Sequence, residues 1–269
     1  MLCTGLTAHR RAAEGDLLGI ERALLFLSLA LLAEVAGTVG GFGSSVFFVP
    51  IANFFFDFES VLGITALFHL ASNLSKLGLF RAGIDRRLLL QLGVPSVLFA
   101  ILGGLAGTLV ETAWLERLLA VFLIGLSGWL LWRPAATFAP STSNAVVAGA
   151  LSGGMAGLVG TGGAVRGLAL AAFDLPKEVF VATSAAIDMG IDLSRAVVYW
   201  RNGYIHADDL AWIPLLAVVA LLGTWLGRRV LRRVPQASFR RIALLLVFAI
   251  GWVTLLGVAL GGDGATGRT

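Results

Sequence analysis

Long apolar stretches separated by short polar turns make up most of the chain. Several of these stretches between residues 23 and 260 reach about 20 residues, enough for a helix to cross a bilayer at about 1.5 Å per residue. The turns between them are rich in charged residues, glycine or proline. This pattern predicts an all-α polytopic membrane protein.

The composition supports this class. The chain is 58% hydrophobic and 13% charged, with a mean hydropathy of +0.89, which is unlike an ordinary soluble domain. Its 269 residues leave room for about eight membrane segments and little else. The net charge of +4 could suggest a nucleic-acid partner, but the arginines gather in short loops, where they set the orientation of membrane helices. We therefore expect no nucleic-acid binding.

Landmarks of the first half recur in the same order in the second half. Asn-Leu-Ser-Lys at residues 73–76 aligns with Asp-Leu-Ser-Arg at residues 192–195, and Pro95 aligns with Pro214. We predict two homologous membrane repeats, residues 23–133 and 145–260. The remaining parts are a polar N-terminal segment (residues 1–22), a linker (residues 134–144) and a C-terminal tail (residues 261–269).

Each repeat begins with a glycine-rich break between two apolar arms. The breaks are Gly-Gly-Phe-Gly-Ser-Ser at residues 40–45 and Gly-Thr-Gly-Gly at residues 160–163. Such breaks are typical of broken or re-entrant helical hairpins. A hairpin returns to its starting side and three full spans follow it, so the second repeat enters from the opposite side. The predicted fold is two inverted repeats, each with a broken or re-entrant hairpin plus three transmembrane helices.

The arginine distribution predicts the orientation. Six arginines between residues 228 and 241 place the loop before the last span in the cytoplasm by the positive-inside rule. Arg81, Arg86 and Arg87 then lie on the same side, and both termini lie outside. Arg10, Arg11 and Arg22 argue mildly against that placement of the N-terminus.

Two predicted spans carry ionisable side chains on one helical face. The later span has Asp188, Asp192 and Arg195, and the earlier span has His69, Asn73 and Lys76 at the same offsets. Charged groups at membrane depth usually face a bundle interior and mark a transport pathway. The alternative is an ion-pair network that only holds the bundle together.

The glycine breaks supply further candidate ligands, because backbone N–H groups leading into a helix N-terminus can bind an anion. Alternatively, the glycines only permit close packing or a kink. The candidate substrate-binding residues are Gly41, Gly43, Ser44, Ser45, Asn73, Lys76, Gly160, Thr161, Gly162, Gly163, Arg166, Asp192 and Arg195. The candidate proton-coupling residues are His69, Asp188 and Glu34, although His69 alone could be a structural residue and Glu34 could be solvated.

No zinc-ligand spacing, nucleophile elbow, Walker loop or Rossmann fingerprint occurs in the sequence. We therefore expect no enzymatic activity, no metal and no cofactor.

The motifs resemble the TauE/SafE sulfite exporter family, also called the four-toluene sulfonate uptake permease family. The resemblance covers nearly the whole chain after residue 22. It rests on residues 40–45 with Pro50, on residues 160–163, on residues 73–76 with the basic turn after them, and on Ser194, Arg195, Tyr199, Arg201 and Gly203. It implies two inverted repeats and transport of small sulfur-containing anions across the bacterial inner membrane. Compared with the family pattern, the carboxylates Asp188 and Asp192 replace neutral polar residues, and Arg166 replaces an apolar residue.

The sequence thus favours a secondary transporter that moves sulfite, a sulfonate or a sulfoacetate-like anion by alternating access, with proton coupling as a further hypothesis. Two other functions stay open. One is a non-transporting membrane scaffold with a buried ion-pair network, and the other is a cation carrier that uses Asp188 and Asp192.

Overall fold

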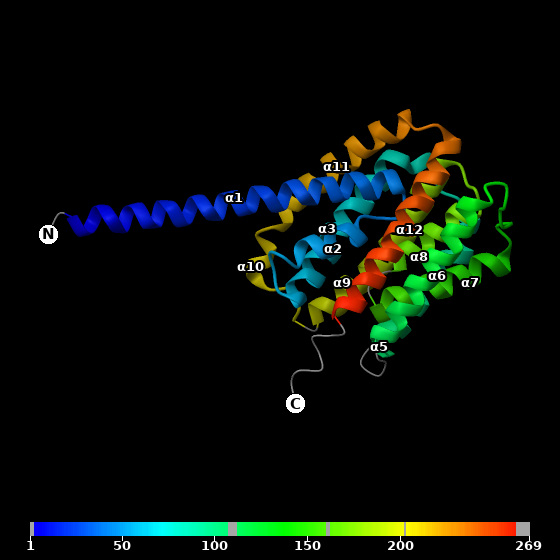
Figure 1. The fold of residues 1–269 in the computed structure, drawn as a ribbon, viewed down its shortest axis with the longest axis horizontal. Coiled ribbons are helices and arrows are strands. Elements are labelled where there is room, and N and C mark those ends of the chain that lie inside the picture. The colour runs from blue at the N-terminus through cyan, green and yellow to red at the C-terminus, as the bar shows by residue number, and fades with distance from the viewer. Residues whose placement is uncertain (1–2, 107–111, 160–161, 202, 262–269) are drawn as a thin grey trace.

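The computed structural model describes residues 3–106, 112–159, 162–201 and 203–261, and the regular elements in these ranges are all helical (Figure 1). The helices of the first half are α1 (Cys3–Gly40), α2 (Ser45–Ala52), α3 (Phe58–Phe80), η1 (Arg81–Gly83), α4 (Arg86–Leu88), η2 (Leu89–Gly93), α5 (Val94–Ala106) and α6 (Thr112–Trp132). Those of the second half are α7 (Thr142–Val159), α8 (Gly162–Ala172), α9 (Lys177–Arg201), α10 (Ala207–Leu210), α11 (Ile213–Arg233) and α12 (Gln236–Gly261).

Five helical segments of the described chain are long and apolar enough to cross a membrane. They are Ile20–Gly40, Arg86–Ala106, Trp114–Trp132, Ile213–Arg233 and Gln236–Ala259. Large apolar side chains such as Leu105, Trp132 and Val253 are exposed on their outer faces, as lipid-facing residues are. The chain is therefore a multi-pass, all-α membrane protein, as the sequence predicts.

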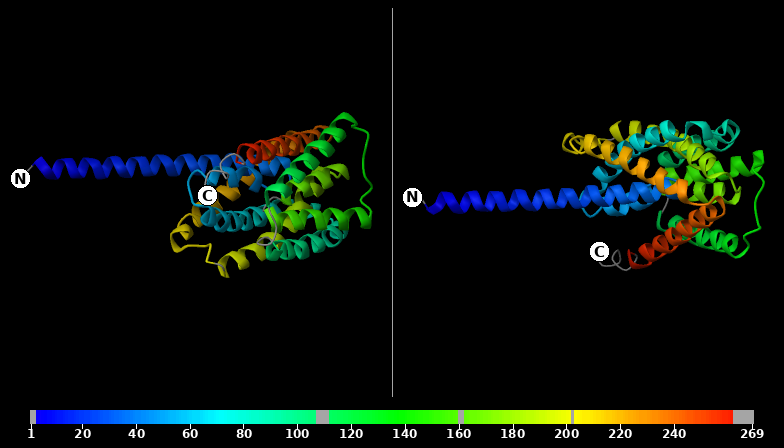
Figure 2. Two further views of the ribbon diagram at one scale, coloured as in Figure 1. Left: turned by 60° about the horizontal axis from the view of Figure 1, so that its bottom comes forward. Right: turned by 90° about the horizontal axis from the view of Figure 1, so that it is seen from above.

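The first helix is longer than its apolar part. α1 runs without a break from the polar N-terminal segment into the first span, and its N-terminal part projects away from the bundle (Figures 1 and 2). It ends at the first glycine break, where Gly41 and Gly43 have φ angles of 81° and 98°. These left-handed conformations favour glycine, because a Cβ would clash with the backbone.

Each half contains a hairpin that returns to the end at which it began. In the first half, the guanidinium of Arg22 donates to the carbonyl groups of Phe54 and Phe55 at 3.3 and 3.4 Å, which ties the segment after α2 to the start of the first span. In the second half, the N–H of Phe138 donates to the carbonyl of Ala172 at 2.8 Å, so α8 ends beside the linker that precedes α7. Both glycine breaks therefore separate the arms of a hairpin.

The two halves are joined by packing of helices from the first half on helices from the second. α3 packs on α9, α6 on α12, α1 on α11 and α5 on α7. α3 and α9 run antiparallel, because Ser60 at the start of α3 lies 3.1 Å from His206 after α9, and Gly83 after α3 contacts the backbone of Glu178 at the start of α9. Each of these helices carries one of the predicted rows of polar side chains, called the polar stripes below: His69, Asn73 and Lys76 on α3, and Asp188, Asp192 and Arg195 on α9. Antiparallel packing of the two helices is the arrangement that inverted repeats require. The repeat relationship itself stays a prediction.

Small residues bring two helix pairs into close contact. A Cβ added to Gly149, Gly153 or Gly157 of α7 would lie 2.0–2.3 Å from a backbone oxygen of the segment η2–α5. In the second helix pair, α1 and α11, a Cβ at Gly223 of α11 would lie 2.7 Å from the side chain of Glu34 of α1. Such glycine contacts let helices approach closely in lipid, where water does not drive them together.

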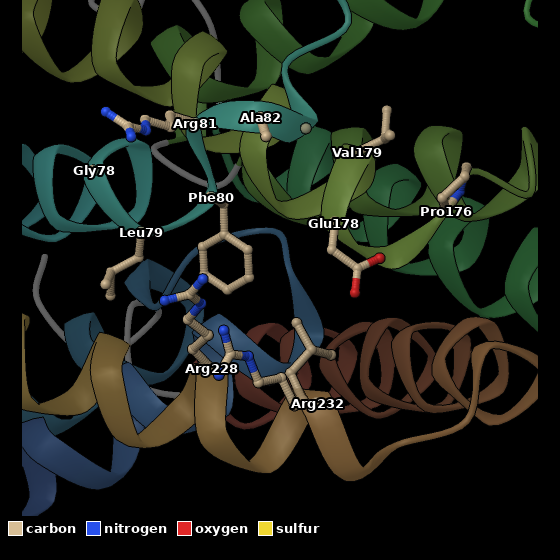
Figure 3. Close-up of a pocket in the computed structure, with 12 residues that line it drawn as sticks. Gly78, Leu79, Phe80, Arg81, Ala82, Pro176, Glu178, Val179, Arg228 and Arg232 are labelled. Carbon is tan, nitrogen blue, oxygen red and sulfur yellow. The ribbon is translucent and has the colours of Figure 1, made fainter.

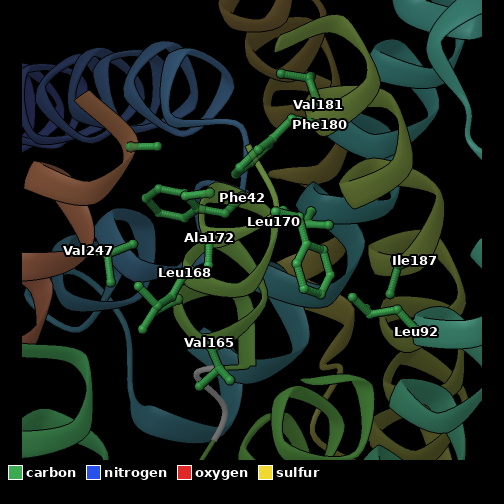
Figure 4. Close-up of a cluster of buried hydrophobic side chains, with 14 of the residues drawn as sticks. Phe42, Leu92, Val165, Leu168, Leu170, Ala172, Phe180, Val181, Ile187 and Val247 are labelled. Atoms are coloured by element: carbon green, nitrogen blue, oxygen red, sulfur yellow. The ribbon is translucent and has the colours of Figure 1, made fainter. Parts of the chain in front are cut away.

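Buried apolar side chains fill the space around the hairpins. One cluster contains Phe42 from the first break, Leu168 from α8, Phe180 from α9 and Val247 from α12 (Figure 4). A second cluster surrounds Phe26 of α1. Phe42 of the first break and the described glycines of the second, Gly162 and Gly163, are thus buried in a packed interior.

The start of α3 is fixed by a polar cap. The side chain of Asp57 accepts a hydrogen bond from the backbone N–H of Ser60 at 3.0 Å. This bond favours the ionised carboxylate and so lowers the pKa of Asp57 below its ordinary value.

Candidate functional site

Ionisable side chains of the two polar stripes point inward and meet in one buried network. Its members come from α1, the first glycine break, α3, α8, α9 and α11. Seven of its sequence-predicted members have an exposed fraction of 5% or less: Glu34, Ser44, His69, Asn73, Lys76, Arg166 and Asp192. Since unpaired charges are costly in such surroundings, the pairing of these groups decides what the network can do.

Glu34 of α1 is the centre of the first part of the network. Its carboxylate is fully buried and pairs with Lys76 of α3, whose Nζ lies 2.8 Å from Oε1. The carboxylate also accepts hydrogen bonds of 2.6–3.2 Å from four hydroxyl groups, those of Thr38, Ser44, Ser72 and Thr224. Lys76 and three of the hydroxyl groups contact Oε1, and Ser44 donates to Oε2, so these five partners of the carboxylate lie within the protein.

His69, Asn73 and Asp192 form the second part, where α3 packs on α9. Asn73 Nδ2 donates to Asp192 Oδ2 at 2.9 Å. The same oxygen lies 3.6 Å from Nδ1 of His69, and Nε2 of His69 lies 3.2 Å from the hydroxyl of Ser44. The imidazole therefore links Asp192 to the cluster around Glu34.

Arg195 lies at the edge of this part. Its Nη1 is 3.7 Å from Asp192 Oδ1, and its Nε donates to the hydroxyl of Tyr199 at 3.1 Å, one turn further along α9. Its side chain is 12% exposed, more than that of Lys76. Both stripe cations are thus already paired with carboxylates.

Arg166 of α8 forms the third part, beside the first glycine break. It is fully buried, donates from Nε to Ser184 at 3.0 Å and from Nη2 to the carbonyl of Phe42 at 3.3 Å, and forms an ion pair with Asp188. Its other terminal nitrogen, Nη1, has no hydrogen-bond partner among the described residues. A Cβ at Gly163 would lie 2.8 Å from the carbonyl of Phe42, so the glycine permits this approach.

A family model described as Sulfite exporter TauE/SafE matches residues 26–254, which is most of the chain. The chain belongs to this family. No curated protein matches the sequence. TauE/SafE proteins are membrane transporters rather than enzymes, so the buried network lies inside a protein of a transporter family.

The network of this TauE/SafE chain is balanced in charge. The carboxylates of Glu34, Asp188 and Asp192 face the cations Lys76, Arg166 and Arg195. With a neutral His69, these six groups sum to zero charge. Asp188 and Asp192 each lie beside an arginine.

The predicted ligands at the glycine breaks have different surroundings. A Cβ at Gly41 would meet the ring of Phe180 at 2.7 Å, and a Cβ at Gly162 would meet the carbonyl of Ser152 at 2.2 Å, so both positions serve close packing. A Cβ at Gly43 would lie 3.4 Å from Asp188 Oδ2, which places Gly43 beside the Arg166 pair. Ser45 is partly buried next to Gly163. Gly160 and Thr161 lie outside the described residues.

Several polar members of the network are absent from the predicted set. Ser72, Thr38 and Thr224 donate to Glu34, and Ser184 accepts from Arg166. Ser72 and Ser184 could be found from their positions close to the stripes. The threonines give no such signal, because a lone threonine in an apolar helix is common and carries no charge.

Proposed function

We propose that the chain is a secondary transporter that moves a small sulfur-containing anion, such as sulfite or a sulfonate, across the bacterial inner membrane by alternating access between its halves. The single observation that carries this proposal is Nη1 of the buried Arg166, which has no hydrogen-bond partner in the part of the chain that the structure describes. A buried donor without a partner costs about 1–3 kcal/mol. An oxyanion would supply the missing acceptor, and a guanidinium is well suited to bind it.

The surroundings of Arg166 support this place for the anion. Asp188, its ion-pair partner, has a side chain that is 15% exposed, whereas Glu34 in the other buried pair is fully enclosed. Gly43 lies beside Asp188, and α2 begins at Ser45, so the first backbone N–H groups of that helix are close to the break. We assign substrate binding to Arg166 and to the backbone at Gly43, with Asp188 as the counter-charge of Arg166, and a structural role to the enclosed Glu34–Lys76 pair.

Charge balance favours coupling to protons. A neutral network that accepts one negative charge becomes anionic in a medium where uncompensated charge is costly. Uptake of one proton for each negative charge of the substrate keeps the network neutral. Binding therefore favours protonation of a group in the network.

His69 is the group best placed to take that proton. Ser44 uses its hydroxyl hydrogen on Glu34, so it can only accept a hydrogen bond from Nε2 of His69. Nδ1 then faces the carboxylate of Asp192 at 3.6 Å, a contact that becomes favourable when Nδ1 is protonated. We assign the coupling proton to Nδ1 of His69.

Transport in proteoliposomes tests the proposal. Sulfite flux should fall to background in Arg166→Gln, because the neutral side chain cannot bind the oxyanion in the same way. Arg229→Gln, which removes an exposed arginine of α11, is the matched control and should keep the wild-type flux. Equal flux in both variants would refute the assigned site.

A buried scaffold is the second candidate, because every charge of the network already has a partner of opposite sign. It predicts no flux of sulfite or sulfonates in the wild-type protein above that of empty liposomes. The pairing of Asp188 and Asp192 with basic groups argues against the cation carrier, which needs free carboxylates.

A further inference from the structure

A cavity of about 730 Å³ opens at the end of the bundle where the two halves meet. Its walls come from the last turn of α3, η1, the start of α9 and the end of α11 (Figure 3). Pockets of this size commonly hold small molecules. Here the size is enough for a small anion together with part of its hydration shell.

The ionisable side chains of the cavity are mostly basic. Arg81, Arg228 and Arg232 line it together with one carboxylate, Glu178, so the lining carries a net positive charge. Arg228 and Arg232 extend side by side from α11 toward Phe80 (Figure 3). Within the described part of the chain, none of the ion pairs involves these three arginines.

Packing fixes one of the guanidinium groups without occupying its donors. The guanidinium carbon of Arg228 lies 5.5 Å from the centre of the Phe80 ring, a cation–π contact. Its N–H groups therefore stay available at the cavity. Neither Arg228 nor Arg232 donates a hydrogen bond to another residue that the structure describes. Two such neighbouring guanidinium groups match the geometry of an oxyanion, which each can bind through two parallel hydrogen bonds.

The cavity lies close to the buried network. Phe80 follows Lys76 by four residues on α3, which corresponds to about 6 Å along the axis. The cavity also brings Arg81 of the first half together with Arg228 and Arg232 of the second, at the end that the positive-inside rule assigns to the cytoplasm. A positively charged hollow at the mouth of a pathway raises the local concentration of an anion.

We propose that this cavity is a second anion-binding site, in which Arg228 and Arg232 hold an oxyanion group at the cytoplasmic end of the protein. Its role as a collecting site for the transported anion rests on the proposed function, whereas binding of the oxyanion does not. The same chemistry can come from a free anion such as sulfite or from the phosphate of an anionic lipid.

Equilibrium binding of radiolabelled sulfite to the full-length protein tests the proposal. The protein carries Arg166→Gln, so that the deep site is removed, and lies in nanodiscs of phosphatidylcholine alone. We expect salt-sensitive binding that weakens about tenfold or more in Arg228→Gln/Arg232→Gln, since charge-assisted hydrogen bonds are lost. The matched control, Arg229→Gln/Arg233→Gln, removes the same charge from the same end of α11 but leaves the cavity lining intact, and should bind like its parent.

A parallel arm identifies the source of the oxyanion. In nanodiscs that contain phosphatidylglycerol, a lipid occupant should displace sulfite and should co-purify with the control but not with Arg228→Gln/Arg232→Gln. Sulfite binding that persists in these discs assigns the site to the free anion. If the two double variants behave alike in both arms, the cavity is not an anion site.

The result of this binding experiment does not depend on whether the protein transports sulfite. Loss of flux in Arg166→Gln tests the deep site, whereas the cavity is measured by binding in a protein that already lacks that site. Size-exclusion profiles and thermal unfolding of the double variants check that each one keeps its fold.

Discussion

Replacement of Lys76 by methionine isolates the energetic role of the Glu34–Lys76 pair. The two charges lie 2.8 Å apart with side-chain exposures of 3% and 0%, so removal of the cation leaves a buried carboxylate without a counter-charge. Breaking such a pair costs about 3–5 kcal/mol. Protonation of the carboxyl group limits this cost, because neutralising a carboxyl with an ordinary pKa of about 4.3 at pH 7 takes about 3.7 kcal/mol.

The expected loss for Lys76→Met at pH 7 is therefore about 3–4 kcal/mol of unfolding free energy. At pH 5 the same protonation costs only about 1 kcal/mol, so the deficit of the variant relative to the wild type should shrink to about that value. The four hydroxyl donors around Glu34 stay in place in this variant and keep the carboxyl group hydrogen-bonded.

The double variant Glu34→Gln/Lys76→Met is the control. It removes both charges, and neutral replacement of a buried ion pair is often close to neutral in stability. Unfolding by a denaturing detergent, followed by tryptophan fluorescence at pH 7 and pH 5, measures all three proteins. Equal stability of the single and double variants at pH 7, or a deficit in Lys76→Met that does not change with pH, would refute the pairing argument.

Further predictions concern backbone and capping residues. Gly153→Ala forces a Cβ to within 2.0 Å of a backbone oxygen and should cost about 1–3 kcal/mol, whereas Gly154→Ala, whose Cβ meets no atom within 4 Å, should cost less in the same unfolding assay. Gly43→Ala places a side chain at a φ of 98° and should lose about 1–2 kcal/mol and reduce sulfite flux, with Gly125→Ala as the control. Asp57→Ala should lower thermal stability at neutral pH, and its difference from the wild type should fade below pH 3.8 as the cap protonates through its lowered pKa.

The sequence predicts the helical membrane class and the two hairpins, because both follow from local patterns. Apolar length gives the spans, and the glycine breaks give the turns. The meeting of the two stripes could also be anticipated. Asn73 and Asp192 occupy matching positions in the two halves, and they hydrogen-bond to each other where α3 crosses α9.

The ion-pair partners of Glu34 and Arg166 could not be predicted in this way. At the offset of 119 positions that aligns Asn73 with Asp192, Glu34 corresponds to Gly153 and Arg166 corresponds to Phe47. These charges therefore have no repeated signal, and their partners depend on how separate helices cross in three dimensions. The sequence also does not separate two roles for Gly41 and Gly162, because glycine serves both anion binding and close helix packing.

The hydrogen bond between Asn73 and Asp192 bears on how such a chain could arise. If the two halves descend from one short ancestor that paired with an upside-down copy of itself, this position faced its own duplicate at the symmetry axis. Two aspartates there would have repelled each other, whereas an amide facing an amide is tolerated. An amide paired with a carboxylate becomes available only after duplication of the gene, when the two copies can mutate separately, so on that history the asymmetry at this contact is younger than the duplication.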